Sequence, residues 1–107
     1  MWSELFVKEA RRRREIFANL SKYLRTIVEA AKSVDPSAEV YLFGSVAEGK
    51  ATVASDIDVL IVTKARPEVV LDALWRKGIE EPFEIHVIPP ELLRIYAKRA
   101  VLQKIYG

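Results

Sequence analysis

The sequence predicts a single domain over residues 1–107 of the α/β (α+β) class, with a small mixed β-sheet flanked by helices. Three observations lead to this prediction. Helical and strand-like segments alternate in the order α-β-α-β-α-β-α, a chain of 107 residues is long enough for one core, and half of its residues are apolar while 30% are charged. This composition is typical of a globular protein and excludes a disordered chain.

A long N-terminal helix is predicted over residues 3–33. Its apolar residues recur at steps of three and four positions, which places them on one face of the helix. Ser3 is a suitable N-cap, and Asp35 followed by Pro36 ends the helix. The four arginines at positions 11–14 interrupt the apolar stripe, so a break in the helix is expected there if the helix is broken at all.

Three strands are predicted, at residues 39–43, 56–63 and 83–88. The first has bulky side chains on both faces, which predicts a central position in the sheet. The second contains an uninterrupted run of β-branched and aliphatic residues at 59–62. The segment 46–55 between these two strands is small and polar, and it is interpreted as one helical turn followed by a loop.

Two further helices are predicted to begin at prolines. Pro67 is followed by an apolar pattern of helical period that continues until Gly78, and Pro90 opens a last helix. No internal repeat, linker or low-complexity segment interrupts this order, so one domain accounts for the whole sequence.

Composition narrows the classes of function. The absence of cysteine excludes disulfides, zinc–thiolate sites and cysteine nucleophiles. No run of about 18 apolar residues predicts a membrane span, and the N-terminus lacks the features of a signal peptide, so a cytoplasmic location is expected. The net charge of only +2 gives no general case for nucleic-acid binding.

Side-chain amides are scarce, with Asn19 and Gln103 the only two, while lysine, arginine and glutamate are abundant. This bias is typical of proteins from hot environments, which we state as a hypothesis.

A pair of carboxylates marks the candidate site. Asp56 and Asp58 are two positions apart on the second predicted strand, so both point to the same face, while Ile57 and Val59 point into the core. Two carboxylates held this close repel each other. A hard cation such as Mg²⁺ removes the repulsion, because it prefers carboxylate and phosphate oxygens.

Glu84 is a candidate third carboxylate. It lies on the third predicted strand, on the face opposite its apolar neighbours. If that strand lies beside the second, three carboxylates can hold two metal ions about 3.5–4 Å apart, the arrangement used for in-line phosphoryl or nucleotidyl transfer. The alternative is an exposed strand acid paired with a lysine.

Gly44 and Ser45 follow the first strand at the start of the short helical turn. Glycine lets a phosphate approach the backbone, and the Ser45 hydroxyl adds a hydrogen-bond donor. An anion cradle is therefore expected one loop away from the carboxylates.

These two motifs together resemble the signature of the minimal nucleotidyltransferases of the DNA polymerase β-like superfamily. The resemblance rests on Gly44-Ser45, a short variable loop, and the run from Ser55 to Val59 that contains both aspartates. It implies a polymerase β-like palm in which Gly44 and Ser45 contact the triphosphate and Asp56, Asp58 and Glu84 bind Mg²⁺.

The same resemblance implies an activity and a partner. Members of the family transfer a nucleoside monophosphate, usually AMP from ATP, to an acceptor hydroxyl. Many small members are similar to antitoxins that pair with an all-helical HEPN ribonuclease. A nucleoside triphosphate and a HEPN-type protein are therefore the expected binding partners.

This sequence departs from the family pattern at several positions. Val46 and Glu48 stand where relatives often carry arginines that offset phosphate charge, and Lys50 is the nearest candidate replacement. Glu84 stands where many relatives have aspartate. Ser55 is expected to cap the loop and orient Asp56, and is grouped with the nucleotide-binding residues.

Three functions remain open from the sequence. The first is an active nucleotidyltransferase, and the second is a catalytically weak antitoxin-like subunit that masks a HEPN ribonuclease. The third, an RNA-binding domain that uses the arginine run, is weaker because the net charge is small. The replaced arginines favour the second.

The roles of two further groups also remain open. His86 shares the face of Glu84 and either contacts nucleotide or metal, tunes Glu84, or is a strand histidine without a catalytic role, which is the favoured interpretation. Arg11 to Arg14 either bind RNA or an acidic partner or, as favoured, form a solvated helix face. Of the apolar residues near both ends, some are expected to pack on the core, and a surplus patch indicates an interface; they are Trp2, Leu5, Phe6, Val101, Leu102, Ile105 and Tyr106.

Overall fold

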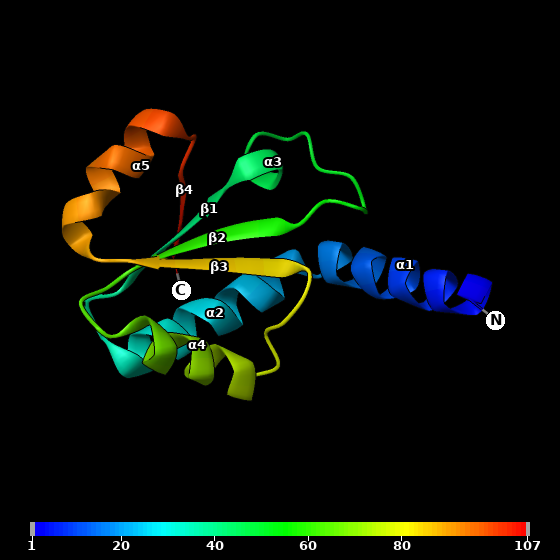
Figure 1. The fold of residues 1–107 in the computed structure, drawn as a ribbon, viewed down its shortest axis with the longest axis horizontal. Coiled ribbons are helices and arrows are strands. Elements are labelled where there is room, and N and C mark those ends of the chain that lie inside the picture. Colours follow the sequence, from blue (N-terminus) through cyan, green and yellow to red (C-terminus); the bar gives the residue numbers. More distant parts are fainter. Residues whose placement is uncertain (1, 107) are drawn as a thin grey trace.

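The structure is a computed structural model that describes residues 2–106, apart from the side chain of Trp2 (Figure 1). Its elements in chain order are α1 (Trp2–Ala18), α2 (Leu20–Val34), β1 (Glu39–Phe43), α3 (Gly44–Ala47), β2 (Ile57–Val62), α4 (Pro67–Arg76), β3 (Phe83–Ile88), the 3-10 turn η1 (Pro90–Leu92), α5 (Leu93–Arg99) and β4 (Gln103–Ile105). The predicted fold class, a small mixed sheet flanked by helices, is confirmed.

The four strands form one sheet in the order β3-β2-β1-β4. β1 pairs antiparallel with both β2 and β4, so its predicted central position is confirmed. β2 pairs in parallel with β3, and the crossover helix α4 connects these two strands. The two acid-bearing strands are therefore direct neighbours, as the three-carboxylate hypothesis requires.

The two faces of the sheet are covered differently (Figure 1). α2 and α4 pack on one face, over a main core that includes Ile27, Ile57, Val59 and Ile61, all with no exposed surface. α5 covers part of the other face, over a smaller cluster centred on Leu60. This second face is left open beyond α5, towards the α3 end of the sheet.

The N-terminal helix is broken at Asn19, not at the arginine run. The Asn19 side chain donates a hydrogen bond to the carbonyl of Glu15 at 2.8 Å, which competes with regular helical bonding. Four arginines are compatible with an exposed helix, because long side chains can separate their charges in solvent. α1 then projects past the end of the sheet (Figure 1).

The C-terminal segment forms a strand that the sequence did not predict. β4 extends the sheet beside β1, with Ile105 opposite Val40. Leu102 and Ile105 pack against the two cores. Four other apolar residues near the ends remain exposed, namely Leu5, Phe6, Val101 and Tyr106. None of the helices among residues 2–106 combines the length and apolar character needed to cross a bilayer.

Candidate active site

Asp58 and Glu84 are brought together by the parallel pairing of β2 and β3. Their Cα atoms are partners in the register, and the Cα of Phe43 is the partner of Asp58 on the other side. Ile57 and Val59, the neighbours of Asp58 in the chain, are completely buried on the opposite face. The alternation of the strand therefore directs the Asp58 carboxylate to the open face.

His86 completes a compact group with these two acids. One potential ligand atom from each of Asp58, Glu84 and His86 lies within 4.8 Å of the other two. The Nε2 atom of His86 lies 3.8 Å from Oδ1 of Asp58 and 3.6 Å from Oε1 of Glu84. We call these three residues the acid–histidine cluster.

The electrostatics of the cluster centre on Asp58, whose side chain is 25% exposed. Burial raises the pKa of this carboxyl above its ordinary value of 3.8, and the neighbouring charge of Glu84 raises it further, while His86 acts in the opposite direction. A group whose charged form is disfavoured in this way gains from a nearby cation. The cluster therefore favours the binding of positive charge.

Gly44 closes the cluster from the side of β1 and α3. A Cβ atom built on Gly44 would lie 2.3 Å from Oδ2 of Asp58, far inside van der Waals contact. Its φ of +71° is also a conformation that other residues rarely adopt. The structure thus gives a physical reason for glycine in the Gly-Ser pair: any side chain would displace the Asp58 carboxylate.

Asp56 lies apart from the cluster. It precedes β2, its side chain is 58% exposed, and Oδ1 lies 3.9 Å from a guanidinium nitrogen of Arg13 on α1. Its charge still contributes to the raised pKa of Asp58. Both aspartates were expected to lie on the second strand and to point to the same face. Only Asp58 does so, because β2 begins one residue after Asp56.

The other residues of the sequence motif lie in the loop that joins α3 to β2. Ser55 caps this loop: its hydroxyl accepts a 2.9 Å hydrogen bond from the backbone N–H of Thr52. Lys50 is strongly exposed, with its ammonium group 3.7 Å from Glu48. Ser45 is partly buried within α3, one residue after Gly44.

Val46 and Glu48 stand at the two positions where the sequence resemblance implies arginine. Val46 packs against the main core, and Glu48 forms the ion pair with Lys50. A cation reaches this loop from a different element. Arg13, only 18% exposed, donates a 3.2 Å hydrogen bond to the carbonyl of Ser55 and lies beside Asp56.

Arg13 was not identified by the sequence reasoning. The favoured interpretation of the arginine run as a solvated face is wrong for Arg13, which binds the Ser55–Asp56 segment. Arg11 and Arg14 are exposed, and Arg12 pairs with Glu80 at the surface. The only signal in the sequence was the helical spacing of Arg13 from Ile16 and Leu20, which directs it partly towards the body.

The donor set of the cluster fits a divalent cation. Two carboxylates and an imidazole converge, and the Nε2 atom of His86 is buried without a hydrogen-bond partner among the described residues. A buried polar atom in this state gains from a ligand. Carboxylate oxygens suit Mg²⁺, and imidazole nitrogen suits transition metals.

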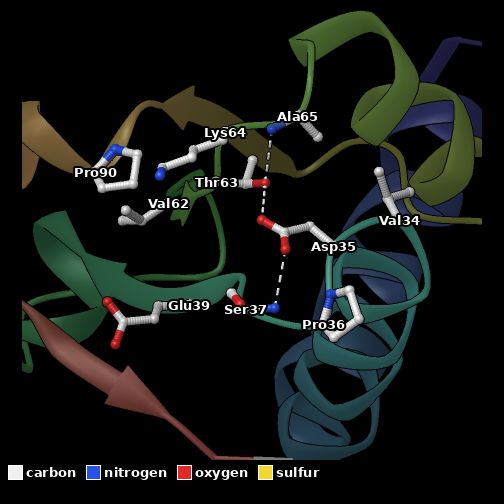
Figure 2. Close-up of a pocket in the computed structure, with 10 residues that line it drawn as sticks. All are labelled: Val34, Asp35, Pro36, Ser37, Glu39, Val62, Thr63, Lys64, Ala65 and Pro90. Carbon is white, nitrogen blue, oxygen red and sulfur yellow. Dashed lines mark hydrogen bonds between the residues drawn. The ribbon is translucent and has the colours of Figure 1, made fainter.

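A cavity of about 540 Å³ lies at the end of the sheet away from the acid–histidine cluster, beside the start of β1 and the ends of β2 and β3 (Figure 2). Its central acid, Asp35, accepts hydrogen bonds from the Thr63 hydroxyl and from the backbone N–H of Ser37. These bonds link the end of α2 to the segments next to β1 and β2. The polar groups at the centre of the cavity therefore already have structural partners. The acid–histidine cluster is the better candidate for chemistry.

Comparison with known proteins identifies the family. The family model for the nucleotidyltransferase domain matches residues 24–105, a stretch that contains Gly44, Asp58, Glu84 and His86. Comparison with curated proteins gives no match. Among solved structures, the chain is similar to a "putative nucleotidyltransferase" from Sulfolobus solfataricus, with 27% identity and a TM-score of 0.59 over 88% of this chain and 85% of that chain.

The structural match supports the fold. The minimal nucleotidyltransferase subfamily, the antitoxin role and the HEPN partner stay predictions. Since the family model covers most of the sequence, this chain belongs to the nucleotidyltransferase domain family.

Proposed function

We propose that this protein is a Mg²⁺-dependent nucleotidyltransferase that transfers a nucleoside monophosphate, AMP from ATP in the first instance, to a hydroxyl acceptor. The observation that carries the proposal is the convergence of Asp58 and Glu84 next to a glycine whose missing side chain leaves room for the Asp58 carboxylate. Membership of the family supports a nucleoside triphosphate as substrate.

Each residue of the site has a proposed role in binding the metal ions or the triphosphate. Asp56, Asp58 and Glu84 hold the divalent ions, with Asp56 oriented by Arg13. When bound, the ions neutralise phosphate charge and lower the pKa of the attacking hydroxyl. Gly44 and Ser45 hold the β- and γ-phosphates.

Lys50 and Ser55 are the other proposed nucleotide-binding residues. Lys50 is exposed and can turn from Glu48 towards the triphosphate. Ser55 fixes the loop that leads to Asp56.

The transfer itself needs one nucleophile and one proton acceptor. The acceptor oxygen forms a bond to the α-phosphorus, the bond from that phosphorus to the pyrophosphate oxygen breaks, and the hydroxyl proton passes to a carboxylate. Glu84 is the proposed proton acceptor, because its side chain is 56% exposed and can reach a substrate.

The test is transfer of label from ATP carrying its label on the α-phosphate, with Mg²⁺ and candidate protein and RNA acceptors. The wild type should label an acceptor, and Asp58→Asn should abolish the transfer. Asp72→Asn is the matched control, because Asp72 is an exposed α4 residue paired with Arg76 and should leave labelling unchanged. Equal labelling by Asp58→Asn and the wild type would refute the assignment.

A second function is favoured by one observation. The two positions where relatives carry arginine have lost their cations, with Val46 in the core and Glu48 paired to Lys50. A chain that binds triphosphate weakly can still act as an antitoxin-like subunit that masks a HEPN-type ribonuclease.

Ribonuclease assays of the candidate partner separate the two functions. Inhibition that survives Asp58→Asn, with no label transfer by the wild type, supports the masking subunit. Inhibition that requires ATP, Mg²⁺ and Asp58 supports the transferase.

A further inference from the structure

We propose that His86 is itself a metal ligand, so that Asp58, Glu84 and His86 together hold a first-row divalent transition metal in preference to Mg²⁺. This inference rests on the proposed function and deepens it. It gives the site two unlike positions: one with a nitrogen ligand, and one formed by Asp56 and Asp58 with oxygen ligands alone.

The position of His86 is the first support. Its Nε2 atom faces both acids, at 3.8 Å from Asp58 and 3.6 Å from Glu84. Those separations are too long for hydrogen bonds. They are slightly longer than the roughly 3 Å between neighbouring ligand atoms of an octahedral ion with bonds of about 2.1 Å. The Glu84 side chain, 56% exposed, can close the separation from His86, and the 3.8 Å separation of Asp58 from His86 lies within about 1 Å of that value.

The unsatisfied state of Nε2 is the second support. The atom is buried and has no hydrogen-bond partner in the part of the chain that the structure describes. Buried polar atoms in native proteins are rarely left without a partner. A metal ion between the imidazole and the two carboxylates would satisfy all three groups at once.

The orientation of the ring is the third support. The ring of Phe43 packs edge-on against the imidazole, with centroids 5.1 Å apart and planes 66° apart. Leu60, completely buried, is the register partner of His86 on β2. The Phe43 contact and the position of His86 beside Leu60 in the sheet place the imidazole on this face, with Nε2 towards the acids, before any ligand binds. Such preorganisation is what a metal site requires.

The chemistry of the donors sets the choice of metal. Mg²⁺ prefers oxygen ligands, whereas imidazole is a ligand for the first-row transition metals, whose affinities rise from Mn²⁺ towards Cu²⁺. One nitrogen and two carboxylate oxygens therefore favour a transition metal at the position next to His86. In this proposal the second position takes only carboxylate oxygens, those of Asp56 and Asp58, and therefore suits Mg²⁺.

The test uses Mn²⁺ as the probe with untagged full-length protein. His86 is the only histidine of the chain, so imidazole-nitrogen modulation in the electron spin echo of bound Mn²⁺ can come from no other residue. The wild type should show this modulation. His86→Ala should lose it, with Mn²⁺ affinity by calorimetry reduced at least about tenfold and Mg²⁺ affinity changed less than about threefold.

Glu84→Gln is the matched comparison, because it removes an oxygen ligand that both metals would share. It should weaken Mn²⁺ and Mg²⁺ alike and keep the nitrogen modulation of residual bound Mn²⁺. The wild-type echo decides the question even if a variant fails to fold.

The outcomes separate this inference from the proposed function. Bound Mn²⁺ without nitrogen modulation would overturn the role of His86 and leave the Mg²⁺-dependent transferase intact. No binding of either metal, with or without ATP, would overturn both. Equal loss of Mn²⁺ and Mg²⁺ affinity in His86→Ala would show that the histidine supports the fold and does not select the metal.

Discussion

Two glycines with the same φ angle allow a controlled test of the site. Gly44 and Gly49 both have φ of +71°. A Cβ on Gly49 would meet nothing within 4 Å, whereas one on Gly44 would lie 2.3 Å from the Asp58 carboxylate. Gly49→Ala therefore measures the backbone cost alone, and Gly44→Ala measures that cost together with the displacement of Asp58.

The expected magnitudes follow from these environments. The left-handed conformation costs an alanine about 1–2 kcal/mol at either position. Gly44→Ala adds an overpacking cost of about 1–3 kcal/mol, because the carboxylate must move away. Urea unfolding of both variants should show Gly44→Ala as the less stable by that difference. Calorimetry should show metal affinity reduced at least about tenfold in Gly44→Ala only.

A double variant completes the test. Asp58→Ala should remove the extra cost of Gly44→Ala, so the two changes should be coupled by about 1–3 kcal/mol in a double-mutant cycle. Equal stabilities and equal metal affinities for the two glycine variants would refute the close approach of Gly44 to Asp58.

Three further predictions concern stability. Asp58→Asn should stabilise the metal-free protein by about 1 kcal/mol at pH 7 in urea unfolding, because it removes a charge that is disfavoured first by burial and then by repulsion from the partly exposed Glu84. Since both effects raise the folded pKa of Asp58, this gain should vanish as pH falls below about 4. Thr63→Val should destabilise the protein at neutral pH, because the Thr63 hydroxyl lowers the pKa of Asp35; the difference from wild type should shrink in unfolding curves taken as pH falls below the ordinary value of 3.8. Ile27→Ala, at a position with no exposed surface, should cost about 2–5 kcal/mol by urea unfolding.

For each of the three variants, one unfolding result would contradict the expected outcome. A stability gain for Asp58→Asn that grows as pH falls would contradict the repulsion argument. A pH-independent effect of Thr63→Val would mean that Asp35 does not depend on that hydroxyl. A cost below about 1 kcal/mol for Ile27→Ala would place this residue outside the tightly packed core.

Local patterns were sufficient to predict the two strands that carry the acids. The alternation around Asp58 and around Glu84 fixed which side chains leave the core, and a short crossover through α4 made the two strands neighbours. His86 was correctly placed on the face of Glu84 for the same reason. Its approach to both carboxylates, and the unsatisfied Nε2 atom, depend on register and could be seen only in three dimensions.

Non-local features were not predictable from the sequence. β4 has only three residues, two of them exposed and polar, so its strand character comes from pairing with β1 and not from its own pattern. The role of Arg13 depends on how α1 leaves α2 at Asn19, since that direction brings the guanidinium to the Ser55 carbonyl. The helical spacing of Arg13 from Ile16 and Leu20 indicates only that the side chain is directed partly towards the body, and it does not identify the Ser55 carbonyl as its partner.

The order of the strands has a consequence for the solution behaviour of the protein. β3 is the last strand of the sheet, and an edge strand offers unpaired backbone groups to other chains. Charged side chains on an edge strand discourage this self-association, and on β3 the exposed charge is Glu84. By this reasoning, the residue proposed to bind metal would also disfavour edge-to-edge association of β3. Selection for solubility and selection for catalysis would then maintain the same carboxylate.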